Sequence, residues 1–165
     1  MADQHSFDIV SKVDFQEINN AIQQTVKEIL TRFDLKDSNT TIDLLEKDNK
    51  IHIQSKDEHK LKSAIEILKQ KFIKRGISPK AIKENKIESG LSGTAKSDLN
   101  IQVGITKENA KVIIAEIKKN NPKLQTQIQD EQIRVITKKI DELQTIIKQL
   151  KEKEFEIPLQ FINYR

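Results

Sequence analysis

The stretch KLQTQIQDEQIRVITKK, Lys123–Lys139, decides the fold expected of this chain. Two alternating runs flank Asp130-Glu131, a pattern typical of antiparallel strands joined by a two-residue turn. The same unit appears earlier as TTIDLLEKDNKIHIQSKDE, Thr40–Glu58, where Asp48-Asn49 marks the turn. A chain of 165 residues therefore contains one hairpin twice, which indicates an internal duplication.

Each hairpin is flanked by two segments with the apolar spacing of an amphipathic helix. Apolar residues three and four positions apart share one stripe of a helix. The residues expected to cap three of these helices at the N-terminus are Asp14, Asp57 and Thr106. The four stripes are Phe15, Ile18, Ile22, Val26, Ile29 and Phe33; Leu61, Ile65, Leu68 and Phe72; Ala110, Ile113, Ile114 and Ile117; and Ile140, Leu143, Ile147 and Leu150.

Further extended segments begin and end each half, at 6–13, 81–88, 99–105 and the closing EIPLQFINYR. Each half then reads β-α-β-β-α-β, so we expect an α+β protein of two ferredoxin-like modules, residues 1–90 and 91–165. Each module would have an antiparallel sheet with two helices on one face, because each helix has a single apolar stripe. Alternatively, the strand at 6–13 is exchanged into the second sheet.

Composition indicates a folded, highly charged protein. It has 36% hydrophobic residues, no cysteine, and 29 basic against 25 acidic residues, a net charge of +4 that does not demand a nucleic-acid partner. No apolar run is long enough to span a membrane, and MADQHSFDIV lacks the pattern of a secretory signal. We expect a cytoplasmic protein with no membrane partner and no disulfide.

Motifs for catalysis or metal binding are weak. The segment Gly90–Ser97, GLSGTAKS, departs from a phosphate-binding loop because Ala95 replaces the second glycine and a strand follows, so we interpret it as a linker between modules. His5, His52 and His59 lack a completing ligand set, which predicts neither a metal site nor a cofactor. No nucleophile motif is present, and we expect a non-enzymatic protein. Of two N-terminal carboxylates, Asp14 would cap a helix and Asp8 would be solvated.

RNA binding by base stacking is disfavoured. Aromatic residues make up 4% of the chain, and Phe15, Phe33 and Phe72 fall on apolar helical stripes, where we expect them to be buried. The predicted strands carry polar residues in place of aromatic rings, among them Gln102, His52, Gln54, Gln132 and Arg134. Binding led by phosphates remains open.

The best candidate binding residues are cations at helix ends, on the second hairpin and at the C-terminus. Arginine is scarce here, with four residues against 25 lysines, and its planar fork suits phosphate recognition. Cations at helix ends are also ordinary structural devices. The candidates for nucleotide binding are Lys74, Arg75, Arg134, Lys138, Lys139 and Arg165.

Four segments resemble the YajQ family of small bacterial proteins: SFDIVSKVD, KRGI, QTQIQDEQIRV with DELQTII after it, and QFINYR. The resemblance spans nearly the whole chain. It implies two ferredoxin-like modules, a cytosolic protein and nucleotide binding without an established catalytic activity, with cyclic di-GMP as the ligand of some members. The leading hypothesis is a cyclic di-GMP receptor that signals to a regulatory protein partner. The alternatives are an RNA-associated or protein-docking module acting through open sheet faces and, third, an enzyme.

Overall fold

The computed structural model describes residues 4–165, which form two compact units. The inserted unit is residues 13–102, and the flanking unit is residues 4–12 together with residues 103–165. The flanking unit contains β1 (His5–Val10), α3 (Lys107–Asn120), β7 (Gln125–Gln129), β8 (Gln132–Thr137), α4 (Ile140–Glu152) and β9 (Gln160–Ile162). The inserted unit contains α1 (Phe15–Thr31), β2 (Thr41–Leu45), β3 (Lys50–Ser55), α2 (Glu58–Lys74), β4 (Ile82–Glu84), β5 (Glu88–Ser89) and β6 (Ala95–Ile101), with short 3-10 turns at Glu46–Asp48, Pro79–Ala81 and Leu91–Gly93.

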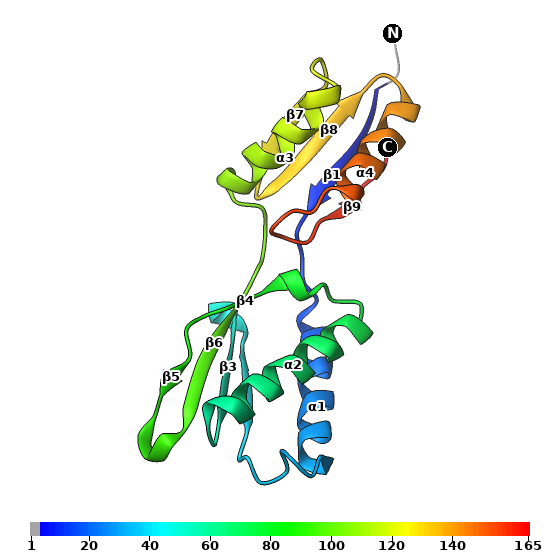
Figure 1. Ribbon diagram of the computed structural model, residues 1–165. Helices are drawn as coiled ribbons and strands as arrows, with labels where there is room; N and C mark the ends of the chain where they lie inside the picture. The colour runs from blue at the N-terminus through cyan, green and yellow to red at the C-terminus, as the bar shows by residue number, and fades with distance from the viewer. Residues whose placement is uncertain (1–3) are drawn as a thin grey trace. The chain divides into compact units, whose positions relative to one another are not determined.

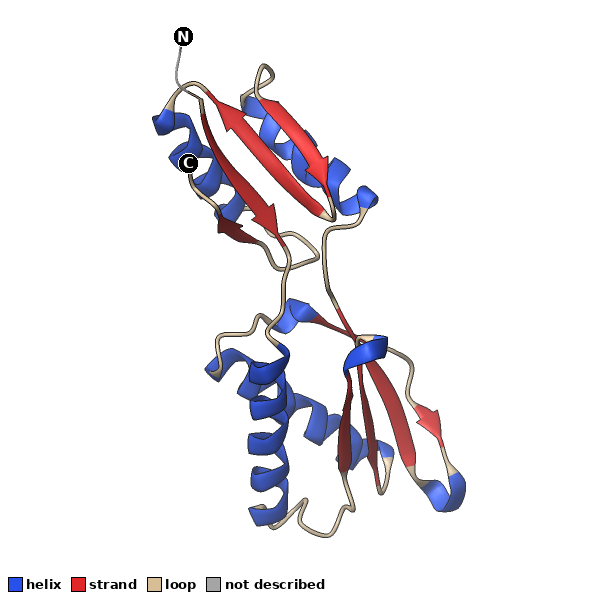
Figure 2. Cartoon of the chain, turned by 180° about the vertical axis from the view of Figure 1, so that it is seen from behind, coloured by secondary structure: helices blue, strands red, loops and turns tan. Residues whose placement is uncertain are grey.

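The two sheets are antiparallel and have equivalent strand orders. The flanking sheet runs β7-β8-β1-β9, and the inserted sheet runs β2-β3-β6-β4, with β5 also bonded to β6. Two helices lie on one face of each sheet, as Figures 1 and 2 show. The expected α+β class with two ferredoxin-like sheets is confirmed.

The leading strand of each half lies in the other half's sheet. In Figure 1, the blue β1 from the start of the chain lies beside the yellow β8 and the red β9, and Asp8 is paired with Arg134 and with Ile162. In the same way β6, which precedes α3 in the chain, pairs with β3 and β4 of the inserted sheet. The strands β1 and β6 are thus exchanged between the halves.

This exchange places the unit boundaries at residues 12/13 and 102/103. We expected the boundary after residue 90, which is 102 − 90 = 12 residues earlier. The reason for the difference is the packing of β6, whose Leu99 and Ile101 are buried in the core of the inserted unit. The segment Gly90–Ser97 is correspondingly no linker. The Gly90 N–H donates to the Thr94 carbonyl at 2.6 Å within the connection from β5 to β6.

Three helices begin at the residues expected to cap them. The Asp14 carboxylate accepts hydrogen bonds from the N–H groups of Gln16 and Glu17, and the Asp57 carboxylate accepts one from Lys60 N–H at 2.8 Å. The Thr106 hydroxyl accepts one from Asn109 N–H at 3.2 Å. These side chains satisfy donors that the first turn of a helix leaves unpaired.

Each unit has its own hydrophobic core between sheet and helices. Residues with no exposed surface include Ile18, Ile51, Leu61, Phe72 and Leu99 in the inserted unit, and Phe7, Ile9, Ile117, Ile133 and Val135 in the flanking unit.

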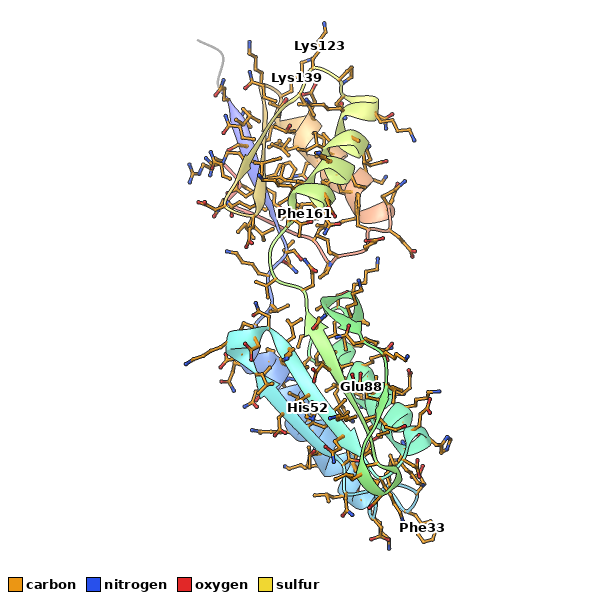
Figure 3. The ribbon with its side chains drawn as sticks, turned by 90° about the vertical axis from the view of Figure 1, so that its left-hand side faces the viewer. Phe33, His52, Glu88, Lys123, Lys139 and Phe161 are labelled. Carbon is orange, nitrogen blue, oxygen red and sulfur yellow. The ribbon has the colours of Figure 1, made fainter. Side chains whose placement is uncertain are left out.

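Two residues of the expected apolar stripes lie outside these cores. Phe33 is 90% exposed because α1 ends at Thr31 and the following turn carries the ring into solvent, where the Lys36 ammonium lies 5.4 Å from its centroid (Figure 3). Ile140 is 57% exposed at the first position of α4. Placing Phe33 in the core was therefore wrong.

Candidate functional site

One end of the flanking unit contains a cavity of about 480 Å³. The loop after α3, the start of β7, the end of β8 and the start of α4 meet there, and Figure 3 shows Lys123 and Lys139 at this end. The lining residues are Gln4, Asn121, Pro122, Lys123, Leu124, Gln125, Ile136, Thr137, Lys138, Lys139 and Glu142.

The register of the β7–β8 hairpin explains why lysines gather at this end. Gln125 lies opposite Ile136 at the end of the ladder, and Lys123, two residues before Gln125, and Lys138, two residues after Ile136, both line the cavity. Asn121-Pro122 ends α3 just before this point, because proline cannot continue a helix that needs its N–H. The hairpin and the end of α3 together define the mouth of the cavity.

The connection from β8 to α4 is held by the Thr137 side chain. Its hydroxyl hydrogen-bonds the Glu142 carboxylate and also accepts a hydrogen bond from the Lys139 N–H at 3.3 Å. Lys139 is the N-cap residue of α4, and its side chain makes no capping hydrogen bond. The lysine side chains of this connection therefore remain exposed at the cavity.

The cavity combines positive charge with apolar walls. It is lined by three lysines and one carboxylate, a formal sum of +3 − 1 = +2, and Thr137 already bonds the carboxylate. Pro122, Leu124 and Ile136 supply the apolar surface, and Gln4, Asn121 and Gln125 supply amide donors and acceptors. Such a lining can hold an anion through ammonium groups and a planar ring through apolar contacts and hydrogen bonds.

Arg134, one of the expected binding residues, forms a bidentate ion pair with Asp8. The Arg134 Nε and Nη2 atoms lie 2.9 and 3.3 Å from the Asp8 oxygens, and Asn163 Nδ2 donates to the same carboxylate at 2.8 Å. The hydrogen bond from Arg134 holds the pKa of Asp8 below its ordinary value, although burial opposes this shift. Asp8 is only 1% exposed, so the expectation that it is solvated was wrong.

Arg75 is paired in the same manner within the inserted unit. Its Nε and Nη2 atoms each lie 2.8 Å from an oxygen of Glu17, and this contact lowers the pKa of Glu17. Arg75 ends α2, whose last residue, Lys74, is exposed. The glycine that follows, Gly76, adopts a positive φ of 76°, and its N–H donates to the Ile73 carbonyl, closing the helix.

The six expected binding residues are divided between the units. Lys74 and Arg75 belong to the inserted unit, and the other four belong to the flanking unit. Of those four, only Lys138 and Lys139 line the cavity. Arg165 exchanges two backbone hydrogen bonds with Ser6, and its charge contributes to the lowered pKa of Asp8.

A second polar cluster lies on the open face of the inserted sheet. His52 Nδ1 lies 2.7 Å from Asp98 Oδ1, and Lys50 Nζ lies 3.6 Å from Asp98 Oδ2. The hydrogen bond with His52, supported by the charge of Lys50, lowers the pKa of Asp98. Within residues 4–165, no group of three histidine, cysteine or acidic side chains is placed to hold a metal ion.

Sequence reasoning missed Lys123 and the three amide side chains of the cavity. Lys123 could have been found from the hairpin, because it comes two residues before Gln125, whose ladder partner Ile136 comes two residues before Lys138. Gln4 and Asn121 gave no such signal, since their place depends on how β1 and α3 pack beside the hairpin. None of the helices in the described part of the chain is both long and apolar enough to cross a bilayer.

The sequence was compared with known proteins. Residues 5–165 match the model of a family described as "Nucleotide-binding protein YajQ-like". A "Nucleotide-binding protein" of Carboxydothermus hydrogenoformans is 49% identical over 165 residues, covering 100% of both chains. One of Citrifermentans bemidjiense is 51% identical over 160 residues, which cover 97% of this chain and 98% of the relative. One of Chloroherpeton thalassium is 42% identical over 165 residues, again covering 100% of both. The chain therefore belongs to the YajQ-like family.

Proposed function

We propose that this protein binds a nucleotide in the cavity of the flanking unit and acts as a binding protein without catalysing a reaction. The observation that carries the proposal is the gathering of Lys123, Lys138 and Lys139 around one cavity of about 480 Å³. That volume lies within the range of small-molecule sites, roughly 300–1,000 Å³. Curated relatives that match the whole chain are named nucleotide-binding proteins, which supports the same ligand class.

The lysines would hold the phosphates. Lys138 and Lys139 lie on the connection that Thr137 fixes, so their backbone positions exist before the ligand arrives. Lys123 lies on the turn that precedes β7, the other strand of the hairpin. Ammonium groups from two sides of the mouth are suited to a ligand that carries more than one phosphate charge. The amides of Gln4, Asn121 and Gln125 would hydrogen-bond the base edge.

The finer proposal is that the ligand is cyclic di-GMP and that the protein is its receptor. Cyclic di-GMP has two phosphodiester charges, which match the formal +2 of the lining, and two guanine edges for the amides. A receptor needs no reacting group, only a higher affinity of the ligand for one state of the protein. The signal would then pass to a regulatory protein partner.

The two ion-paired arginines have structural roles in this proposal. The forks of Arg134 and Arg75 already bind Asp8 and Glu17, so each pair presents little net charge to a ligand. Lys74 and Arg165 lie outside the cavity lining. Phosphate binding is therefore assigned to Lys138, Lys139 and Lys123, of which the first two were expected from the sequence.

Equilibrium binding of fluorescent cyclic di-GMP tests this site. The double variant Lys138→Glu/Lys139→Glu should bind at least about tenfold more weakly than wild type, because each charge-assisted hydrogen bond contributes about 1.5–3 kcal/mol. The matched control is Lys107→Glu/Lys111→Glu, which changes the net charge equally on exposed positions of α3 away from the lining. Equal affinity of the two variants for cyclic di-GMP would show that the nucleotide does not bind at this cavity.

A short single-stranded RNA serves as the competing ligand in the same assay. The open face of the flanking sheet carries Gln127, Gln132 and Arg134 and offers no aromatic ring at these positions for base stacking. We expect weak RNA binding that salt abolishes. Salt-resistant RNA binding that survives in Lys138→Glu/Lys139→Glu would favour the alternative function through an open sheet face.

A further inference from the structure

The strand β7 is an edge strand without the usual protection. It ends the flanking sheet, and no strand within residues 4–165 pairs with its outer edge. Its sequence, QTQIQ, contains no charge, proline or glycine over five residues. Soluble proteins normally protect such edges with charges, proline, bulges or very short strands, because the unpaired N–H and C=O groups can pair with another chain.

The other edge strands in the described chain all have such a device. β2 carries Asp43, β4 carries Lys83 and Glu84, and β5 carries Glu88. β9 has only three residues, with Pro158 before it and Asn163, at a φ of 57°, after it. The exposed edge of β7 is therefore a specific feature and not a general property of this fold.

The hairpin geometry determines which backbone groups of β7 point outward. Asp130 and Glu131 both have positive φ, 46° and 65°, as in a type I′ turn, so the closing pair Gln129 and Gln132 is hydrogen-bonded. Hydrogen-bonded pairs alternate along an antiparallel ladder. The N–H and C=O groups of Thr126 and Ile128 consequently point away from β8. Ile128 is 50% exposed beside them.

This edge is complementary to itself. In an antiparallel pairing with a twofold axis at Gln127, Thr126 lies opposite Ile128 of a second copy, and these are the residues with outward groups. In the same register Gln125 lies opposite Gln129, so every pair formed within β7 joins uncharged side chains. The pairing therefore brings no like charges together.

We propose that β7 is a self-association edge, through which two copies of this protein join their flanking sheets into one continuous antiparallel sheet. Four backbone hydrogen bonds and the covered Ile128 side chains would hold the dimer. Such an interface is small, so the association is weak and depends on concentration. Gln127 does not line the nucleotide cavity, so this proposal stands independently of the proposed function.

A cysteine at Gln127 tests the register directly. The chain has no cysteine, so Gln127→Cys introduces the only thiol. In the proposed pairing the two Gln127 residues form a non-hydrogen-bonded pair with Cα atoms about 4.5 Å apart, which suits a disulfide. Mild oxidation should give a dimer band from Gln127→Cys and little from Gln132→Cys, which is on the same face of the inner strand β8. Equal crosslinking of both variants would overturn the proposal.

Sedimentation of the wild-type protein and of Gln127→Glu completes the test. The wild-type mass should rise from 19.0 kDa toward 2 × 19.0 = 38.0 kDa with concentration. Gln127→Glu should stay at the lower mass, because two carboxylates would face each other at the axis, while in the free chain Arg134 lies opposite the new carboxylate. A wild-type monomer at about 1 mM, or a dimer that Gln127→Glu leaves intact, would contradict the proposal.

Discussion

At the scale of single residues, two arginines of the candidate set and the three lysines of the cavity have different environments. Arg134 and Arg75 each place a guanidinium fork on one carboxylate, where it ties neighbouring elements of one unit together. None of the cavity lysines, Lys123, Lys138 and Lys139, forms an ion pair with any residue that the structure describes. These two arginines therefore support the fold, and the three cavity lysines are available for a ligand.

Removing the charge of Asp8 should destabilise the flanking unit. Asp8→Asn removes the buried carboxylate that pairs with the Arg134 guanidinium. We therefore expect a loss of about 1–3 kcal/mol in the free energy of unfolding at pH 7. Chemical denaturation measures this loss. Asp43→Asn, at an exposed position of β2, is the control and should change stability by less than about 0.5 kcal/mol.

The same pair makes stability depend on acid. The pKa of Asp8 in the folded protein lies below its ordinary value of 3.8, chiefly because Arg134 donates to the carboxylate. A lowered folded pKa contributes stability above the unfolded pKa and loses it as the pH falls below about 3.8 toward the folded value. The difference between wild type and Asp8→Asn should shrink over that interval. A constant difference from pH 7 to pH 3 would show that the ion pair is not its source.

At the scale of elements, the β7–β8 turn carries backbone strain. Glu131 has a φ of 65°, in the left-handed region, which costs a residue with a Cβ about 1–2 kcal/mol. Glycine adopts this φ without strain but loses more conformational entropy on folding. Glu131→Gly should therefore raise the free energy of unfolding by a net amount of about 0.5–1 kcal/mol. Glu131→Ala removes the same carboxylate but keeps the strain, so it should give no such gain. Thermal unfolding of the two variants separates these effects.

The helices and hairpins could be predicted from the sequence, which left the strand at 6–13 open between the two sheets and did not predict the exchange of β6. Caps such as Asp57 and apolar stripes such as Leu61, Ile65 and Leu68 are local signals, and α2 begins after its predicted cap. The exchange of β1 and β6 depends on tertiary contacts, because the alternation of apolar and polar residues in β1 would fit either sheet equally well. The burial of Asp8 follows from that pairing, since only the β1–β8 register places it opposite Arg134.

The candidate site was predictable only where it lies within one hairpin. Lys138 and Lys139 follow β8 directly, and cations clustered after a strand are visible in the sequence. The cavity also needs Gln4 and Asn121, which are brought to the hairpin by β1 and α3. The apolar spacing of α1 continued to Phe33, but the helix ends earlier, because periodicity does not specify where a helix stops.

At the scale of the whole molecule, the exchange of leading strands makes one unit continuous in sequence and the other discontinuous. Residues 13–102 contain every strand of the inserted sheet and its complete core. A fragment of residues 13–102 should therefore fold cooperatively, as circular dichroism during heating would show. A fragment of residues 1–90 should not, because it lacks β6, which lies between β3 and β4. Cooperative folding of the 1–90 fragment alone would contradict the exchange.

The function proposed for the whole protein depends on the flanking unit, where the cavity lies. The central claim is that a nucleotide binds the lysines at that cavity, and melting temperatures of the full chain test it most directly. Wild type and Lys138→Glu/Lys139→Glu would be heated with cyclic di-GMP, GTP, ATP and inorganic phosphate at matched salt. A ligand at a hundredfold excess over its Kd stabilises the folded state by about 2.7 kcal/mol, a clear shift. We predict a shift with cyclic di-GMP in wild type and a clearly smaller shift in the variant; no shift with any nucleotide, or the same shift in both proteins, would contradict the claim.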